Sequence, residues 1–223
     1  MQGFLAYDNE KKSKEPGILI VHDWMGLGDF TKDKAKKLAQ KGYVAFAVDI
    51  YGKGVRPKDN QEAAVIAKQY LQNRPLLRSR IKAAYDKLAS MKLVDAHKMV
   101  VMGYCFGGAT ALELARSGAP LVGTVSFHGT LDTPTPMDAK NIKGKVLVFQ
   151  GADDPHVPPK DVAAFKDEMK NAGVDLEFIA YPGAVHAFTN PQAGNDNSKG
   201  VAYNANADKQ SWKRFEAFLK EVF

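Results

Sequence analysis

The chain has 223 residues, of which 45% are hydrophobic and 25% are charged, and its formal net charge is +6. Its lysines and arginines are spread along the chain without a block of about five or six. We therefore expect a solvated basic surface and no nucleic-acid partner. One cysteine excludes an internal disulfide framework and leaves the redox compartment open.

No apolar run approaches the ~20 residues that span a bilayer, so we expect no membrane partner. The first residues lack the apolar core of a signal peptide. We therefore expect a cytoplasmic protein, and a periplasmic protein whose leader has been removed is the open alternative. The sequence does not distinguish between oligomeric states, and we expect a monomer or a small homo-oligomer.

Short apolar runs alternate with amphipathic stretches along the whole chain. The predicted strands are 1–7, 17–22, 43–48, 99–102, 121–127, 145–150 and 175–180. The predicted helices are 30–41, 60–72, 76–91, 109–116, 160–172 and 208–222. Continuous apolar runs are typical of strands buried on both faces, and alternation with helices of about 10–15 residues indicates a parallel, doubly wound sheet. We predict a single α/β domain over residues 1–223, with helices on both faces of a mostly parallel central sheet.

The sole cysteine lies in a strand–turn–helix segment. Residues Gly103–Gly108 read Gly-Tyr-Cys-Phe-Gly-Gly, between the predicted strand 99–102 and the predicted helix 109–116. This arrangement resembles the nucleophile elbow of α/β-hydrolases, with Cys105 in the place of the usual serine. Glycines permit the tight, strained turn, and a helix N-terminus favours the thiolate form of a cysteine. The competing interpretation is a buried, unreactive cysteine. A suitable acid and a histidine further along the chain would favour the nucleophile.

A pair of acids follows the predicted strand 145–150. Asp153 and Asp154 lie where the carboxyl ends of parallel strands gather catalytic groups. We assign the orienting acid to Asp154, because Pro155 and Val157 fix the turn behind it. Adjacent acids in loops are commonly turn or cap residues, and we give that role to Asp153.

The histidine of the predicted triad is His186, which follows the last strand in a glycine-containing loop. This completes the hydrolase order of nucleophile, acid and histidine. The other histidines are His22, His97, His128 and His156. We expect His97 at the opposite end of the sheet, and the other three near the pocket. No histidines or carboxylates show metal-ligand spacing on a helix, so we predict no metal and no cofactor.

An oxyanion hole needs two backbone donors. The N–H of Phe106, the residue after the nucleophile, is the first. The loop that follows the strand 17–22 supplies the second, which we assign to the N–H of Trp24. Aromatic residues near these segments are expected to line the substrate pocket, with core packing as the competing role. They are Tyr51, Tyr104 and Phe188.

Four segments together resemble the dienelactone hydrolase family, over nearly the whole chain. In chain order they are the strand end His22-Asp23-Trp24, the elbow Gly103–Gly108, Gly151-x-x-Asp154-Pro155, and Tyr181-Pro182-Gly183 before His186. The resemblance implies an α/β-hydrolase fold and a triad of Cys105, Asp154 and His186.

The chain departs from the family pattern at two places. The family usually carries Glu at the position of Asp23, where the carboxylate holds or activates the resting thiol, so the resemblance implies a thiol-tuning role for Asp23. Members that act on dienelactone hold its carboxylate with arginines, one of them four residues after the histidine, where this chain has Asn190. Candidates for a second arginine are Arg74, Arg78 and Arg80. Loss of a bidentate clamp favours neutral or less acidic substrates.

We therefore expect a carboxylesterase, similar to dienelactone hydrolase (carboxymethylenebutenolidase), that hydrolyses small-molecule esters or lactones through a cysteine acyl-enzyme. The alternative is a protein that keeps the hydrolase fold to bind a ligand without turnover, or to sense redox state through its one thiol.

Overall fold

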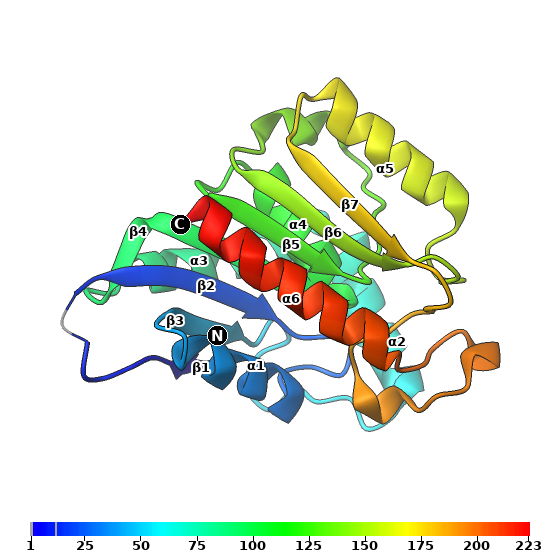
Figure 1. Ribbon diagram of the computed structural model, residues 1–223, viewed down its shortest axis with the longest axis horizontal. Helices are drawn as coiled ribbons and strands as arrows, with labels where there is room; N and C mark the ends of the chain where they lie inside the picture. Colours follow the sequence, from blue (N-terminus) through cyan, green and yellow to red (C-terminus); the bar gives the residue numbers. More distant parts are fainter. Residues whose placement is uncertain (1, 12) are drawn as a thin grey trace.

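The strands form one sheet in the computed structural model, which describes residues 2–11 and 13–223 (Figure 1). They are β1 (Gly3–Ala6), β2 (Glu15–Val21), β3 (Val44–Val48), β4 (Val94–Tyr104), β5 (Gly123–Phe127), β6 (Lys145–Gly151) and β7 (Leu176–Tyr181). Their order in the sheet is β1-β3-β2-β4-β5-β6-β7. Only β1 pairs antiparallel, with β3, and the other pairs in this sheet of the described residues are parallel. The predicted mostly parallel sheet is confirmed.

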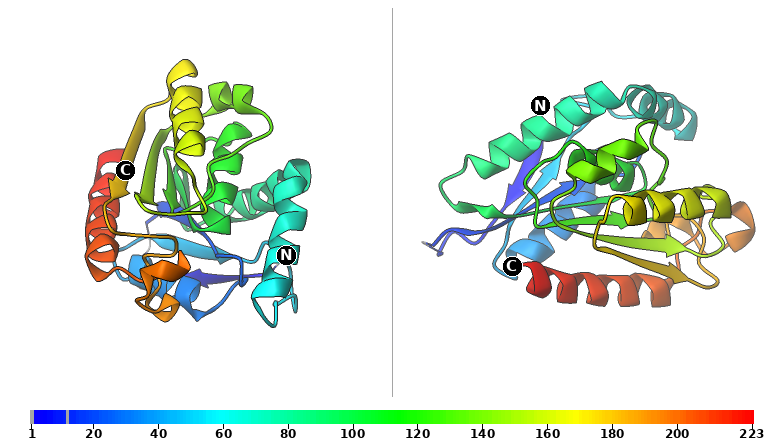
Figure 2. Two further views of the ribbon diagram at one scale, coloured as in Figure 1. Left: turned by 90° about the vertical axis from the view of Figure 1, so that its right-hand side faces the viewer. Right: turned by 90° about the horizontal axis from the view of Figure 1, so that it is seen from above.

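Helices cover both faces of the sheet (Figure 2). The α-helices are α1 (Asp29–Ala39), α2 (Asn60–Gln72), α3 (Arg74–Ala89), α4 (Phe106–Arg116), α5 (Pro159–Asn171) and α6 (Ala205–Val222). Three short 3₁₀ helices are η1 (Pro136–Asn141), η2 (Pro191–Ala193) and η3 (Asn197–Lys199). α1 and α6 pack on one face, and α3, α4 and α5 on the other. Within the described chain, no helix is long and apolar enough to cross a membrane.

The apolar runs form strands because both faces of the sheet are covered. Successive side chains of a strand point to opposite faces. In β2, Ile18 and Ile20 pack in the cluster with α1 and α6, whereas Leu19 and Val21 pack in the cluster with α3 and α4. All four are fully buried, and burying such a side chain stabilises the fold by about 1.5–3 kcal/mol. A strand in this position has no exposed face that would favour polar residues.

Several element boundaries differ from the prediction, and two of them have a clear local reason. The helix predicted from residue 76 begins at Arg74, because Pro75 occupies the first turn, where a missing N–H costs no hydrogen bond. The strand predicted over 99–102 begins at Val94, before a polar and exposed stretch that hides its strand character in the sequence.

The parallel strands set the place of the site. The arrowheads of β2 and of β4 to β7 point toward the same edge of the sheet (Figure 1). In a parallel sheet of this kind, ligand and catalytic groups gather at that carboxyl edge. The loops after β2, β4, β6 and β7 carry the site residues predicted from the sequence.

Candidate active site

Cys105 joins the end of β4 to the start of α4. Its backbone lies in the left-handed region, with φ 54° and ψ −117°, which a non-glycine residue adopts only where the surroundings impose it. The N–H of Cys105 donates to the carbonyl of Phe127 on β5 over 3.0 Å, and the N–H of Gly108 donates to the carbonyl of Cys105 over 2.9 Å. The cysteine is therefore held in a strained turn between two strands and a helix, with its side chain partly exposed.

The glycines of the elbow are required by close backbone contacts. A Cβ on Gly103 would lie 2.1 Å from the carbonyl oxygen of Gly107. A Cβ on Gly107 would lie 2.3 Å from the carbonyl oxygen of Val21, at the end of β2. The first turn of α4 therefore packs directly on the sheet backbone, and this contact brings the cysteine to the carboxyl edge.

A chain of hydrogen bonds connects the thiol to a buried carboxylate. The Sγ atom of Cys105 lies 3.0 Å from Nε2 of His186, and Nδ1 of His186 lies 2.9 Å from Oδ2 of Asp154. Asp154 also accepts from Nε2 of Gln150 over 2.7 Å and from the N–H of His156 over 2.8 Å. These extra donors hold the carboxylate in one orientation, and neither was expected from the sequence.

The two charged neighbours of His186 decide its protonation. The residue is only 7% exposed. Burial by itself lowers the pKa of an imidazole, but the negative charges of the Cys105 thiolate and the Asp154 carboxylate outweigh it and raise the pKa of His186 to about 10. The arrangement therefore favours the protonated form of His186.

The other acid of the pair has a different position. Asp153 is exposed, and its Oδ2 accepts from the N–H of Gly183 over 3.0 Å. It closes the turn between the loops after β6 and β7 and makes no contact with His186 among the described hydrogen bonds. This geometry agrees with the turn role given to Asp153.

The loop that carries His186 is fixed by its backbone. The N–H of His186 donates to the carbonyl of Gly200, and the carbonyl of His186 accepts from Ala202. The next residue, Ala187, has a φ of 57°. Among the described residues, the other non-glycine residues with positive φ are Cys105 and His128, so the strained backbone is concentrated around the site.

Two further histidines contact the ring of His186. His128 is buried, its Nε2 lies 2.8 Å from Oγ1 of Thr189, and its ring centre is 5.3 Å from that of His186. Burial holds the pKa of His128 well below its usual value, and the positive field of His186 acts in the same direction. His156 is exposed, with its ring centre 5.1 Å from that of His186.

The predicted oxyanion donors lie on either side of the elbow. Phe106 is the first residue of α4, so its N–H has no partner within the helix. No acceptor for the N–H of Trp24 is found among the loop hydrogen bonds of the described residues. Neither N–H has an acceptor among the described hydrogen bonds, so the oxyanion role of both stays a prediction.

Asp23 lies beside this loop and is partly buried. Its Oδ1 accepts from the N–H of Met25 over 2.8 Å. Burial raises the pKa of the Asp23 carboxyl, although the Met25 N–H and the charge of His186 oppose the shift. In the described chain no hydrogen bond joins Asp23 to Cys105, so the thiol-tuning role of Asp23 stays a prediction.

The three aromatic residues expected in the pocket lie in different surroundings. The ring of Tyr51 lies 5.3 Å from that of Phe106, close to the elbow. Tyr104 and Phe188 are 1% and 0% exposed and belong to the hydrophobic cluster under α1 and α6. Core packing accounts for both of these rings. Tyr51 is also buried, in the cluster with α3 and α4, but it lies beside Phe106 of the elbow, so we keep it alone as a residue near the pocket.

The comparison with known proteins agrees with this geometry. The model of the dienelactone hydrolase family matches residues 1–223. The chain belongs to the dienelactone hydrolase family. A Caenorhabditis elegans protein, K02A2.1, is 38% identical over 154 residues, which cover 66% of this chain and 94% of that protein.

Solved structures show the same fold. The structure named m3DLH has a TM-score of 0.95 and 37% identity, and the match covers 99% of this chain and 92% of that one. A dienelactone hydrolase-like promiscuous phosphotriesterase from metagenomic libraries has a TM-score of 0.92, 37% identity and the same coverage. These likenesses support a hydrolase of the dienelactone hydrolase family with the α/β-hydrolase fold.

Each arginine that could hold an acidic substrate has at least one protein partner. Asn190 caps η2, where its side chain accepts from the N–H of Gln192. Arg74 pairs with Asp132 over 3.0 Å. The other two candidates also have structural partners: Arg78 binds Glu113 and Asp138, and Arg80 binds the carbonyl of Ile50. The carboxylate clamp of dienelactone-cleaving members has no ready counterpart in these contacts.

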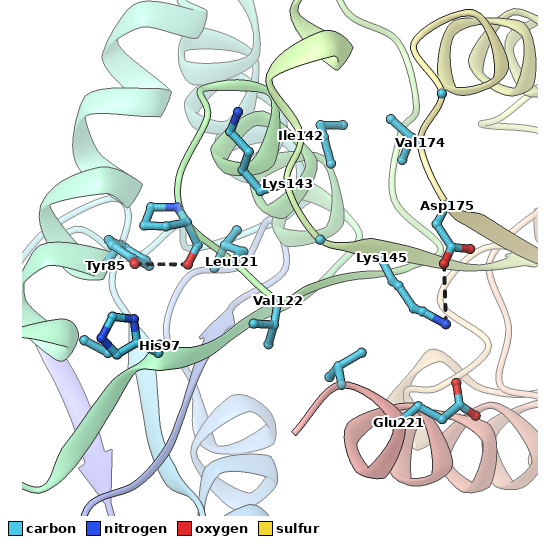
Figure 3. Close-up of a pocket in the computed structure, with 15 residues that line it drawn as sticks. Tyr85, His97, Leu121, Val122, Ile142, Lys143, Lys145, Val174, Asp175 and Glu221 are labelled. Atoms are coloured by element: carbon cyan, nitrogen blue, oxygen red, sulfur yellow. Dashed lines mark hydrogen bonds and ion pairs between the residues drawn. The ribbon is translucent and has the colours of Figure 1, made fainter.

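An open groove of about 850 Å³ lies at the other edge of the sheet (Figure 3). It is lined by the segments that lead into β5, β6 and β7 and by His97 near the start of β4, at the end of the sheet where His97 was expected. Lys145 pairs there with Asp175 over 3.4 Å. The groove contains no triad residue, and among the described residues no group of three or more His, Cys, Asp or Glu could hold a metal ion.

Proposed function

We propose that this protein is a carboxylic ester hydrolase that acts on neutral esters or lactones through an acyl-enzyme on Cys105. One observation carries the proposal: Sγ of Cys105 lies 3.0 Å from His186, which in turn lies 2.9 Å from Asp154, at a strained strand–helix elbow. A nucleophile, a base and an orienting acid in this order are the parts that acyl transfer needs.

In the first half-reaction the Cys105 thiolate attacks the carbonyl carbon, and a C–S bond forms. The carbonyl oxygen becomes an oxyanion, which accepts from the N–H groups of Trp24 and Phe106. The C–O bond to the leaving group then breaks as His186 donates its proton to the departing alkoxide. The products are the alcohol and a thioester on Cys105.

The second half-reaction uses water. His186, now neutral, removes a proton from a water molecule that attacks the thioester carbon. The C–S bond breaks, the carboxylic acid leaves, and the thiolate is paired again with a protonated His186. Asp154 holds the imidazole in the orientation that both steps need, and the nearby Asp23 carboxyl tunes the resting thiol.

The arginine contacts support a neutral substrate. Arg78 and Arg80 are held by protein acceptors, and Asn190 caps a turn. An acidic lactone would therefore lack the arginine that members acting on dienelactone have at the position of Asn190, whereas a neutral ester needs none. We accordingly expect an uncharged p-nitrophenyl ester to be cleaved with a higher kcat/KM than an acidic lactone of similar size.

The proposal is tested by turnover of p-nitrophenyl acetate and butyrate by the wild type, Cys105→Ala and Cys105→Ser. We expect turnover by the wild type, an acyl adduct on Cys105 by mass spectrometry under rapid quench, and loss of about 10³-fold or more in kcat for Cys105→Ala. Full residual turnover by Cys105→Ala would exclude the triad mechanism. A wild type that binds these esters without cleaving them would favour a ligand-binding protein instead.

A second candidate is phosphotriester hydrolysis, because a relative with 37% identity is described as a promiscuous phosphotriesterase. The Cys105 thiolate would attack phosphorus, an S–P bond would form, and an aryl oxide would leave; water would then cleave the S–P bond. A p-nitrophenyl dialkyl phosphotriester assayed beside the carboxylic esters tests it. The same Cys105→Ala variant distinguishes turnover at this site from background hydrolysis.

A further inference from the structure

The peptide between Asp23 and Trp24 is held by a buried histidine. Nδ1 of His22 lies 2.5 Å from the carbonyl oxygen of Asp23, and Nε2 of His22 accepts from the N–H of Ile50 over 3.1 Å. Because Nε2 is the acceptor, the ring proton is on Nδ1 and is donated to Asp23. His22 is 0% exposed, so no water competes for either contact.

This contact sets the direction of one N–H group. In a trans peptide the C=O and the N–H point to opposite sides, and no cis peptide bond is found among the described residues. The carbonyl of Asp23 points at His22, so the N–H of Trp24 points away from His22. A hydrogen bond on the carbonyl also polarises the N–H of the same peptide and makes it a stronger donor.

The next peptide is held from the other side. The hydroxyl of Tyr51 donates to the carbonyl of Trp24 over 2.9 Å, and Tyr51 is 4% exposed. The rings of His22, Tyr51 and Phe106 pack on one another, with centres 4.8 to 5.8 Å apart. Two consecutive carbonyls of the loop are thus fixed by side chains that themselves have no freedom to move.

We infer that His22 is a positioning residue, which holds the Asp23–Trp24 peptide so that the Trp24 N–H serves as an oxyanion donor. The inference rests on the proposed function. The environment keeps the ring neutral: burial lowers the pKa of His22 to about 4, with the Asp49 carboxylate and the Arg56 guanidinium as the charged groups that face it. The Nδ1–H and the Nε2 lone pair are therefore both available over the neutral pH range.

Two amide variants separate the two contacts of the ring. The amide of asparagine takes the place of Nδ1, so His22→Asn keeps a donor to Asp23 and loses the acceptor for Ile50. The amide of glutamine takes the place of Nε2, so His22→Gln keeps the acceptor for Ile50 and loses the donor to Asp23. Removal of a whole oxyanion donor lowers kcat by about 10²–10³. We expect kcat on p-nitrophenyl butyrate to fall about 10–100-fold in His22→Gln and less than about 5-fold in His22→Asn, with KM within about twofold in both.

A second readout separates positioning from folding. A trifluoromethyl ketone forms a thiohemiketal on Cys105 whose oxyanion occupies the hole, whereas alkylation of the thiol by iodoacetamide uses no oxyanion donor. We expect His22→Gln to weaken the ketone about as much as it lowers kcat, and to leave the alkylation rate within about twofold. Equal losses in both variants, with equal loss of thermal stability, would show a structural role only and overturn the inference.

The experiments distinguish a failure of the proposed function from a failure of the inference about His22. If the wild type cleaves no ester, the proposed function is wrong, and the amide signal of Trp24 in a ¹H–¹⁵N spectrum still tests His22. That signal shifts in His22→Gln and stays closer to the wild type in His22→Asn if the Asp23 carbonyl is held by Nδ1. The same shift in both variants would overturn the inference without reference to turnover.

Discussion

His186 and His128 show how acidic neighbours can reverse the effect of burial on the pKa of a histidine. Both rings are buried and their centres are 5.3 Å apart. Burial lowers the pKa of both rings, but Cys105 and the Asp154 carboxylate outweigh it at His186 and raise that pKa to about 10, whereas His128 has no acidic partner among the described residues and its pKa stays well below the usual value. A charged ring and a neutral ring thus lie side by side. His128 can therefore pack against His186 without competing for the proton that the proposed mechanism moves.

At the scale of single residues, we expect substitutions of the two adjacent acids, Asp153 and Asp154, to have different effects on kcat. Asp154→Asn removes the charge that holds Nδ1 of His186, and in serine triads an acid-to-amide change costs about 10⁴ in kcat. We expect a loss of about 10³–10⁴ in kcat on p-nitrophenyl butyrate for Asp154→Asn, and less than about threefold for Asp153→Asn. Steady-state kinetics of both variants, with thermal melts as a control for folding, check this. Greater damage from Asp153→Asn would reverse the assignment.

The sequence predicts some of these residues better than others. Cys105, Asp154 and His186 can be predicted because each lies in a turn motif after a strand, and the structure brings all three within hydrogen-bond distance. The contact of Gln150 with Asp154 has no sequence signal, since it depends on which way the end of β6 turns. The ring of Tyr104 could not be assigned either, because a residue beside an elbow can face the pocket or the core.

At the scale of elements, the elbow depends on the contact of α4 with β2. α4 begins at Phe106, three positions before the predicted start at residue 109. Local propensity misplaces this boundary because Gly107 and Gly108 are poor helix formers. Close packing overrides propensity here, since the backbone of β2 leaves no room for a Cβ at Gly107. By contrast α2 spans the predicted residues 60–72, where local capping and packing agree.

Substitution of an elbow glycine tests this contact. In Gly107→Ala the new Cβ would lie 2.3 Å from the Val21 carbonyl and 2.5 Å from the His22 carbonyl, and both are backbone atoms that cannot rotate away. We expect a loss of about 3 kcal/mol or more in the free energy of unfolding, measured by urea denaturation. The matched control is Gly28→Ala, since the nearest atom to its Cβ is 3.9 Å away and its φ is −120°. We expect that control to change stability by less than about 1 kcal/mol, and equal losses in the two variants would contradict the packing argument.

At the scale of the whole molecule, the fold follows from the sequence more completely than the site does. Continuous apolar runs specify strands buried on both faces, and the alternation of strands with helices specifies a parallel sheet whatever the loops contain. The contacts of His186 have no such signal, since its loop is held by backbone hydrogen bonds to Gly200 and Ala202, which follow η3. Hydrophobic periodicity predicts which segments form the layers of the fold, but it does not predict how the peptides of a loop are oriented.

The same edge of the sheet buries two neutral histidines, and this couples the stability of the whole molecule to pH. His22 faces Asp49 and Arg56, and His128 faces His186 and Lys34, yet burial is the largest influence on both and lowers both pKa values. A base with a lowered pKa in the folded state binds its proton more readily when unfolded. The stability it contributes is therefore present above the unfolded pKa of 6.5 and is lost as the pH falls toward the folded value. His186 acts in the opposite direction, because its contribution to stability is present below pH 6.5 and is lost as the pH rises through about 10.

We therefore expect the free energy of unfolding to fall as the pH is lowered from 6.5 to about 4. His22 should account for about 3 kcal/mol of this loss, which is the free energy equivalent of the shift of its pKa from 6.5 to about 4. Urea denaturation at a series of pH values measures this in the wild type and in His22→Gln, which carries no titrating ring at that position. The variant should be less stable near neutral pH, and its stability should fall less steeply in acid. The matched control is His97→Gln, at an exposed position on the opposite edge of the sheet, and it should keep the wild-type slope. If His22→Gln also keeps the wild-type slope, the buried ring is not the group that links folding to acid.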